Sequence, residues 1–355
     1  MIDSLLQRYA FFALAAAALF GVSAPLAKLL VAGMPPLLLA GLLYLGSGVY
    51  LALLRGWRRF NRDSAAPPGE TALAGRDYAW LAAAILCGGM LAPVLLVWGL
   101  TGLAAASASL LLSSESVLTA LIAALLFREA VGPRIWLAAA LLCAASLALA
   151  YDPREGASLS LHALAILAAC ALWGLDNNLT RQISSADPVA IAMAKGLSAG
   201  SVNCALALAL GATLPGPGPL AASLALGAAS YGVSLVLYIL ALRHLGSART
   251  GAHFSTAPFF GAVFAVAVLG EPVTITLAVA LALTIVATWL VLTEKHAHQH
   301  VHAYLEHAHR HARDTHHQHA HDGSEGPEPH AHLHVHPPLT HTHPHLPDLH
   351  HRHGH

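Results

Sequence analysis

The stretch from Leu103 to Phe127 reads LAAASASLLLSSESVLTALIAALLF and carries one charged residue, Glu115, near its centre. A helix of these 25 residues is long enough to cross a bilayer with some tilt. A carboxylate at that depth costs roughly 3 kcal/mol or more in lipid, so Glu115 is expected to face protein or an aqueous cavity. The serine and threonine side chains around it let neighbouring helices approach closely and form hydrogen bonds. The stretch therefore predicts a polar site inside a membrane-spanning bundle.

The composition indicates a membrane protein. Of the 355 residues, 56% are hydrophobic and only 10% are charged, whereas soluble domains carry about 25% charged residues. The formal net charge is zero with histidine neutral, which gives no indication of a nucleic-acid partner. The sequence shows neither a phosphate-binding glycine loop nor a constellation of catalytic residues. Direct use of ATP and enzyme activity are therefore not expected.

Apolar segments of spanning length predict an all-α polytopic membrane protein with ten transmembrane helices. The predicted spans are at about residues 9–31, 35–54, 78–99, 103–127, 134–151, 161–180, 189–210, 220–241, 248–269 and 273–293. With the N-terminus inside, eleven arginines lie in or beside cytoplasmic segments and one, Arg154, lies in an external loop. This bias predicts insertion into the cytoplasmic (inner) cell membrane with both termini in the cytoplasm.

The two halves of the chain resemble each other. At an offset of 153, Phe20-Gly21, Lys28 and Pro35 match Trp173-Gly174, Arg181 and Pro188. Residues 106–129 align with 248–271 at an offset of 142. Because five spans per repeat is an odd number, the two repeats are expected to have opposite orientations in the membrane. Many secondary transporters have this plan, with the substrate site near mid-membrane between the halves. The predicted parts are a first repeat, a second repeat and a tail at residues 1–151, 152–295 and 296–355.

Three runs resemble the EamA family of the drug/metabolite transporter superfamily: FGVSAPLAK (20–28), LLLSSESVLTALIAALLFRE (110–129) and GSARTGAHFSTAPFFGAVFAVAVLGE (246–271). The resemblance covers about residues 9–293 and implies a ten-helix carrier, often an exporter of amino acids or other small metabolites. The family positions that it marks are Gly21, Pro25, Lys28, Glu115, Glu129, Pro258 and Glu271. The second repeat has Ala257 where Glu115 would fall, so a central carboxylate would be single.

Glu115 is the first candidate for the substrate site. Because burial penalises the charged form of a carboxyl group, Glu115 could exchange a proton during a transport cycle. The alternative is a structural carboxyl group that neighbouring hydroxyls satisfy. An uncharged amide could have made such a structural contact, which favours the functional interpretation.

Polar residues also interrupt the sixth span, in the sequence WGLDNNLTR. Asp176, Asn177 and Asn178 fall in its cytoplasmic half, and Lys195 lies at a similar depth on the seventh span. An ion pair between Asp176 and Lys195 would lower the cost of burying either charge. The pair could be a structural tie or could contact a zwitterionic substrate, or both groups could snorkel to the inner interface.

Other candidates have a structural interpretation that is more common. Lys28 is expected to snorkel to the headgroups, and His253 is more often a hydrogen-bonded core residue than a ligand or relay. Tyr231 and Tyr238 are seven residues apart on one helical face and could line a cavity, although aromatic residues in helices more often pack or anchor at the interface.

The composition changes completely in the histidine-rich tail. Proline, glycine and charge argue against a packed core, so the tail is expected to be disordered. Its alternating histidines are candidate metal ligands, because two imidazoles of a His-x-His run can reach one ion and suit Zn, Ni, Co and Cu. The candidates are His296, His298, His300, His302, His307, His309, His311, His330, His332, His334 and His336. The tail could buffer or sense metal, pass it to the membrane part, or have no metal role.

The favoured hypothesis is a secondary carrier for a small organic metabolite, working by alternating access without a required cofactor. One alternative is a divalent-metal transporter fed or regulated by the tail, although the spans lack a cluster of metal ligands. Another is a membrane-tethered metal buffer or sensor. The expected partners are the lipid bilayer, a small-molecule substrate and divalent metal ions at the tail, and the chain is expected to be a monomer or homodimer.

Overall fold

The computed structural model describes residues 2–60, 75, 77–127, 132–152, 158–183, 187–245, 250 and 253–293, and the tail segments 297–302, 305–311, 330–336 and 339–344. Within these residues, nine helices are long and apolar enough to cross a membrane, and the shorter apolar helix Ala257–Ala267 occupies the predicted ninth span. The all-α polytopic fold predicted from the sequence is confirmed.

Several spans consist of more than one helical segment. In the first repeat the segments are α1 (Ile2–Gly21), α2 (Ser23–Val31), α3 (Pro36–Phe60), α4 (Asp77–Ala84), the π-helix η1 (Ile85–Leu91), α5 (Ala92–Gly102), α6 (Ala105–Leu111), α7 (Ser114–Phe127) and α8 (Pro133–Ala150). The short strands β1 (Tyr151–Asp152) and β2 (Ser158–Leu159) pair between the repeats. In the second repeat they are α9 (Leu161–Arg181), α10 (Pro188–Ala209), α11 (Pro217–Gly227), the π-helix η3 (Ala228–Val233), α12 (Ser234–Leu245), α14 (Ala257–Ala267) and α15 (Ile275–Leu292).

Prolines and capping side chains fix where several helices begin. Proline stands in the first turn of α8, α10, α11 and α14, where its missing N–H has no intrahelical partner to lose. Asp187 accepts a hydrogen bond from the Val189 N–H at 2.8 Å, and Thr274 accepts one from the Leu277 N–H at 3.1 Å. These caps satisfy N–H groups that a helix leaves unpaired at its start.

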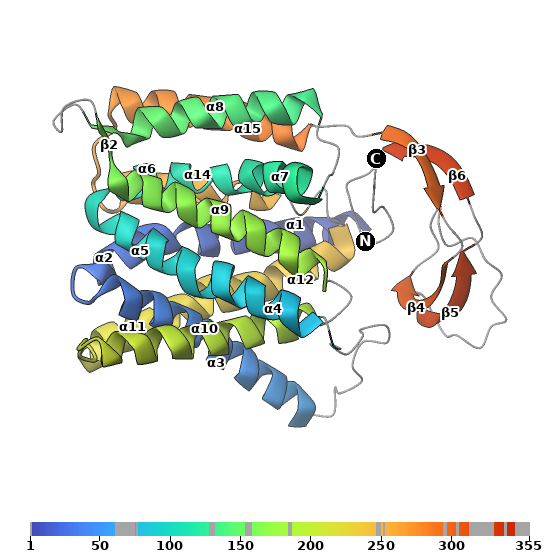
Figure 1. The fold of residues 1–355 in the computed structure, drawn as a ribbon, viewed down its shortest axis with the longest axis horizontal. Coiled ribbons are helices and arrows are strands. Elements are labelled where there is room, and N and C mark those ends of the chain that lie inside the picture. The colour runs from blue at the N-terminus through green and yellow to red at the C-terminus, as the bar shows by residue number, and fades with distance from the viewer. Residues whose placement is uncertain are drawn as a thin grey trace.

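The helices follow the repeat seen in the sequence. The π-helices η1 and η3 begin at Ile85 and Ala228, and α7 and α14 begin at Ser114 and Ala257, in each case 143 residues apart. Two of the closest helix pairs join equivalent spans, since α3 packs along α10 and α8 along α15 (Figure 1). Equivalent helices that meet in this way are expected around an axis that relates two inverted halves.

Glycines allow α3 and α10 to approach closely. A Cβ atom at Gly200 would lie 2.4 Å from the Leu45 nitrogen, and one at Gly196 would lie 2.8 Å from the Gly48 Cα. Glycine therefore seats α10 against α3 within the bundle, as small residues do at helix contacts in membranes.

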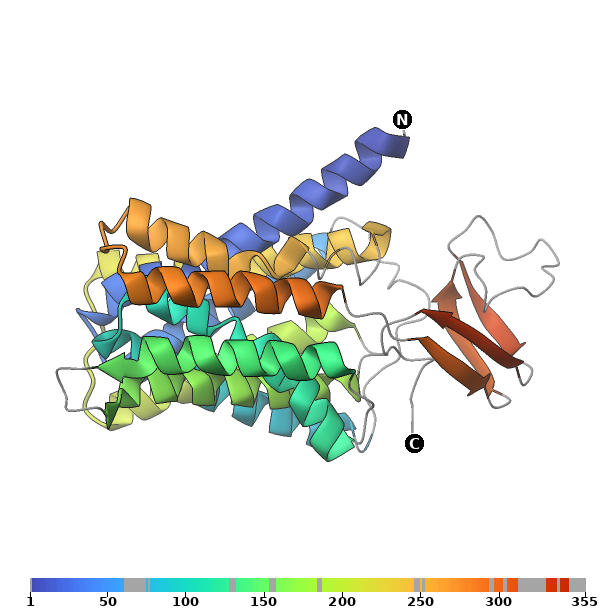
Figure 2. The same cartoon turned by 90° about the horizontal axis from the view of Figure 1, so that it is seen from above.

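The first helix begins and the last helix ends at the same end of the bundle (Figures 1 and 2). The connection through β1 and β2 and the one from α14 to α15 lie at the opposite end. An even number of spans requires this arrangement.

Four segments of the tail are extended and paired. Strand β3 (Ala297–His302) pairs with β6 (Leu339–Pro344), and β4 (Leu305–His311) pairs with β5 (His330–His336), both antiparallel. The alternating His-x-His pattern has the two-residue period of a strand. The other tail residues, including His296, lie outside the described residues, and disorder of the tail as a whole stays a prediction.

Candidate functional site

Glu115 lies in the first turn of α7, directly after the break between α6 and α7. Its Oε1 accepts a hydrogen bond from Asn177 Nδ2 at 3.0 Å, and the same amide lies 3.3 Å from Thr119 Oγ1. Glu115 is half-buried and Asn177 is exposed, although both belong to spans that pack on each other. A carboxylate in a membrane-spanning helix is expected to face the protein interior or an aqueous cavity.

Asp176 and Lys195 form the ion pair predicted between the sixth and seventh spans. Lys195 Nζ lies 2.6 Å from each carboxylate oxygen of Asp176, and Thr180 Oγ1 donates to Asp176 Oδ1 at 3.0 Å. Asp176 is only 5% exposed, so it does not reach the membrane interface. A Cβ atom at Gly88 would lie 2.0 Å from Asp176 Oδ2, so π-helix η1 can pass the pair only with glycine there.

Asn178 makes contacts within the protein. Its side-chain amide donates to the Gly174 carbonyl at 2.8 Å and to the Thr119 carbonyl at 3.0 Å, and the residue is buried. These bonds tie α9 to α7, which favours a structural role. Asn177, one position earlier, is the amide that reaches Glu115.

Five aromatic rings form a continuous cluster beside the charged groups. Tyr231 lies 5.7 Å between ring centroids from both Tyr44 and Phe20. The cluster continues from Phe20 to Phe254 at 5.5 Å, and from Phe254 to Tyr238 at 4.9 Å. We call these five residues the aromatic cluster. They come from both repeats, and all five are half-buried.

Trp173 connects the aromatic cluster to the polar side of the site. Its indole N–H lies 2.9 Å from the Gly88 carbonyl oxygen and 3.4 Å from the Tyr44 hydroxyl, which itself donates to the Gly88 carbonyl at 2.7 Å. The carbonyl belongs to π-helix η1, and π-helical turns occur often at functional sites. Asn177, one helical turn after Trp173 on α9, donates to Glu115. The charged groups and the aromatic cluster are therefore connected through α9.

Lys28 reaches residues of the loops at one end of the bundle. Its ammonium lies 3.5 Å from Glu271 Oε1 and donates a hydrogen bond to the Leu103 carbonyl, and its side chain is 30% exposed. The Glu271 carboxylate accepts from the backbone N–H groups of Ala105 and Ala106 at 2.7 and 2.8 Å. Glu271 therefore caps α6 and forms an ion pair with Lys28, and snorkelling of Lys28 to the headgroups stays a prediction.

The remaining family positions lie near the breaks in the spans. Gly21 faces the backbone of α14, where a Cβ atom would lie 2.0 Å from the Ala257 carbonyl oxygen. Pro25 is buried in α2, and Pro258 is in the first turn of α14. His253 precedes this helix, and its carbonyl oxygen accepts from the Thr256 hydroxyl at 2.6 Å. Glu129 lies outside the described residues.

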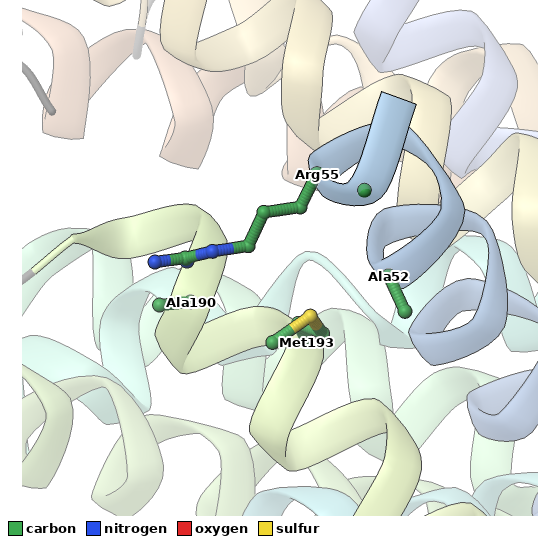
Figure 3. A pocket seen from close by; sticks show the side chains of 5 residues that line it. Ala52, Arg55, Ala190 and Met193 are labelled. Atoms are coloured by element: carbon green, nitrogen blue, oxygen red, sulfur yellow. The ribbon is translucent and has the colours of Figure 1, made fainter. Parts of the chain in front are cut away.

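A separate cavity of about 340 Å³ lies between α3 and α10 (Figure 3). Its lining residues are Ala52, Arg55, Gly56, Ala190 and Met193. Arg55 Nη1 lies 2.6 Å from Asp187 Oδ2. This mostly apolar cavity contains none of the predicted site residues, so the Glu115 site remains the candidate for substrate.

Among the side chains that the structure describes, no group of three or more His, Cys, Asp or Glu residues could hold a metal ion. Nothing is described of the tail histidine side chains, and metal binding there stays a prediction. Five residues near the site were not predicted from the sequence: Phe20, Tyr44, Trp173, Phe254 and Gly88. Phe20 and Trp173 occupy equivalent repeat positions, a signal that could have marked two of them.

The sequence matches the EamA-like transporter family twice, over residues 7–151 and 160–293. An uncharacterized transporter of Methanothermobacter thermautotrophicus is 29% identical over 266 residues, which are 72% of this chain and 78% of that protein. A solved crystal structure with 18% identity has a TM-score of 0.56 and covers 80% of this chain and 95% of its own, which shows a shared fold alone. Because the family matches both repeats and most of the chain, this protein belongs to the EamA-like transporter family.

Proposed function

We propose that this chain is a secondary carrier for a small organic metabolite, amino-acid-like or related, which it exports by alternating access. The observation that carries the proposal is the half-buried Glu115 carboxylate, which has an amide partner in Asn177 on α9, the helix whose Trp173 contacts Tyr44 of the aromatic cluster. A site between two inverted halves can be exposed to either side when the halves rock against each other. The proposal includes no enzyme activity and no required cofactor.

In this carrier Glu115 is the group that exchanges a proton with the substrate or with solution. The carboxylate keeps one neutral hydrogen-bond donor, Asn177, so protonation does not break an ion pair. Asn177 orients the carboxyl group, and Asp176 with Lys195 keeps the adjacent helices in place. The opposite charges of Asp176 and Lys195 form a fixed dipole, and the electric field of this dipole is stronger where little water screens it.

The carrier is inserted into the cytoplasmic membrane with both termini in the cytoplasm. The asymmetric distribution of arginine and the even number of spans support this orientation. The tail then lies in the cytoplasm, where we propose that it binds Zn, Ni, Co or Cu as an accessory to transport. Its alternating histidines support this role, and the backbone register pairs His298 with His343 and His309 with His332.

Flux into proteoliposomes tests the proposal. The full chain, a chain ending at Lys295 and Glu115→Gln are compared for uptake of labelled amino acids and amines, and of zinc, nickel and cobalt. A metabolite carrier keeps organic flux after truncation and loses it in Glu115→Gln. Metal flux that is lost on truncation would instead establish a tail-fed metal transporter. A chain that binds metal but carries no solute would be a membrane-tethered metal buffer or sensor.

A further inference from the structure

The two sides of the site differ in chemistry. Asp176 and Lys195 lie on α9 and α10, and their repeat equivalents are Ser23 and Leu42, at an offset of 153. Ser23 hydrogen bonds to Tyr231 of the aromatic cluster. The second repeat therefore contributes a charged pair on α9 and α10, whereas the equivalent positions of the first repeat contribute a hydroxyl and an apolar side chain.

The charges on the described residues leave the site with an excess of one negative charge. Lys195 neutralises Asp176, because both carboxylate oxygens lie 2.6 Å from its ammonium. Glu115 has an uncharged amide as its hydrogen-bond partner, and none of the described lysine or arginine side chains forms an ion pair with it. Lys195 also acts electrostatically on Glu115, but both oxygens of Asp176 already hold its ammonium. Among the described side chains, a half-buried and unprotonated Glu115 thus has no cation of its own, which is costly unless a ligand supplies the positive charge.

The aromatic cluster suits the same ligand. Tyr44 is connected to the Glu115 side chain through α9, because Trp173 lies 3.4 Å from the Tyr44 hydroxyl and Asn177, one turn further along, donates to Glu115. Tyr231 lies 5.7 Å from Tyr44 between ring centroids. Ring faces attract ammonium groups within about 6 Å, and desolvation strengthens this attraction. Beyond these tyrosines, Phe20, Phe254 and Tyr238 offer apolar ring surface for the rest of a substrate.

We infer that the substrate is an amphipathic organic cation, with a protonated or quaternary ammonium group at Glu115 and an apolar or aromatic body against the aromatic cluster. An anionic substrate would be repelled by the Glu115 carboxylate. The carboxylate of a zwitterion would have to displace Asp176 from Lys195. This inference rests on the proposal that the chain is a carrier with its site at Glu115, and it specifies the substrate class of that carrier.

The test uses four compounds with the same phenyl body and different charges. They are 2-phenylethylamine, benzyltrimethylammonium, phenylalanine and 3-phenylpropionate. Thermal shift of the purified full chain reports binding, and uptake into proteoliposomes reports transport. We expect the two cations to bind and enter, with binding at least about tenfold tighter than that of the zwitterion or the anion.

Variants of single residues test whether Glu115 and the aromatic cluster determine the preference for cations. Glu115→Gln should lose cation uptake by at least about tenfold, and Glu115→Asp should retain part of it. Tyr231→Phe, which keeps the ring, should bind the cations normally, whereas Tyr231→Leu should bind them about three- to tenfold more weakly. Tyr78→Leu is the matched control, because Tyr78 is exposed at the start of α4 and lies outside the aromatic cluster. If Tyr231→Leu fails to fold, a comparison of cation uptake by the wild type and by Glu115→Gln still tests whether the ammonium group binds at Glu115.

The outcomes separate this inference from the proposed function. Preference for phenylalanine or 3-phenylpropionate over the cations would overturn the cation inference and leave the carrier intact. Absence of binding and uptake for all four compounds at millimolar concentration would also overturn it, whereas the carrier proposal fails only if the wider set of labelled solutes also shows no flux. Cation uptake that is unchanged in Glu115→Gln would overturn the placement of the ammonium group.

Discussion

Lys195 Nζ lies 2.6 Å from both carboxylate oxygens of Asp176, and this contact joins α10 to α9 beside the proposed substrate site. The Asp176 side chain is 7% exposed and that of Lys195 is 17% exposed, so the pair lies largely inside the protein. A buried pair gains little net stability, because desolvation offsets the attraction between its charges, but loss of one partner leaves an uncompensated charge.

Removal of one partner should therefore cost more than removal of both. Lys195→Met is expected to destabilise the protein by about 3 to 5 kcal/mol, and the double variant Asp176→Asn with Lys195→Met by much less. Equilibrium unfolding in detergent measures the difference. Arg55→Gln is the control, because it breaks a pair with Asp187 in which both side chains are about a quarter to a third exposed. Such a pair contributes about 0 to 1 kcal/mol. Additive effects at Asp176 and Lys195 would show that the two charges do not compensate each other.

Proton exchange at Glu115 gives a second prediction. In the wild type, an imposed pH gradient should drive substrate flux, because a carboxyl group that binds a proton on one side can release it on the other. Glutamine cannot exchange a proton, so any flux that remains in Glu115→Gln should be the same with and without the gradient. Tracer flux at several values of internal and external pH measures this. A pH-driven flux that persists in the variant would assign proton coupling to another group.

The sequence predicted the parts of the fold that depend on composition and repetition. Span positions follow from apolar runs, and the repeat offset places equivalent segments in both halves. The Asp176 and Lys195 pair was predicted from the cost of burying single charges at a similar depth. Glu115 was found because a carboxylate in an apolar run is unusual. Each of these signals lies within one short stretch of chain.

The breaks in the spans and the ring contacts could not be predicted in this way. The fourth span contains neither proline nor glycine, so the sequence does not show that α6 ends near residues 112 and 113. Tyr44 stands in an ordinary apolar span, and its role depends on contacts with Trp173 and Tyr231 that the chain brings together only on folding. The ion pair of Lys28 with Glu271 was not predicted, because the two residues are distant in the sequence.

The hydrogen bonds that Glu271 accepts at the start of α6 should contribute more to stability than its ion pair with Lys28. Its carboxylate accepts the N–H groups of both Ala105 and Ala106, so Glu271→Ala leaves two donors at the start of α6 without an acceptor. Each unsatisfied buried donor costs about 1 to 3 kcal/mol. Lys28→Met removes the ion pair and the hydrogen bond to the Leu103 carbonyl, but both N–H groups of α6 keep their acceptor. It should cost clearly less than Glu271→Ala in thermal unfolding. Equal losses in the two variants would show that the charge pair, rather than the helix cap, carries the effect.

The contact between α3 and α10 gives a prediction about glycine. Gly200→Ala would place a Cβ atom 2.4 Å from the Leu45 backbone nitrogen, so the helices must move apart. Overpacking of this kind costs about 1 to 3 kcal/mol. Gly218→Ala is the matched control, because a Cβ atom there meets no atom within 4 Å. This control should be neutral or slightly stabilising, since alanine restricts the unfolded chain. Thermal unfolding of both variants separates the two cases, and a Gly200→Ala protein as stable as the control would contradict the close packing of α3 on α10.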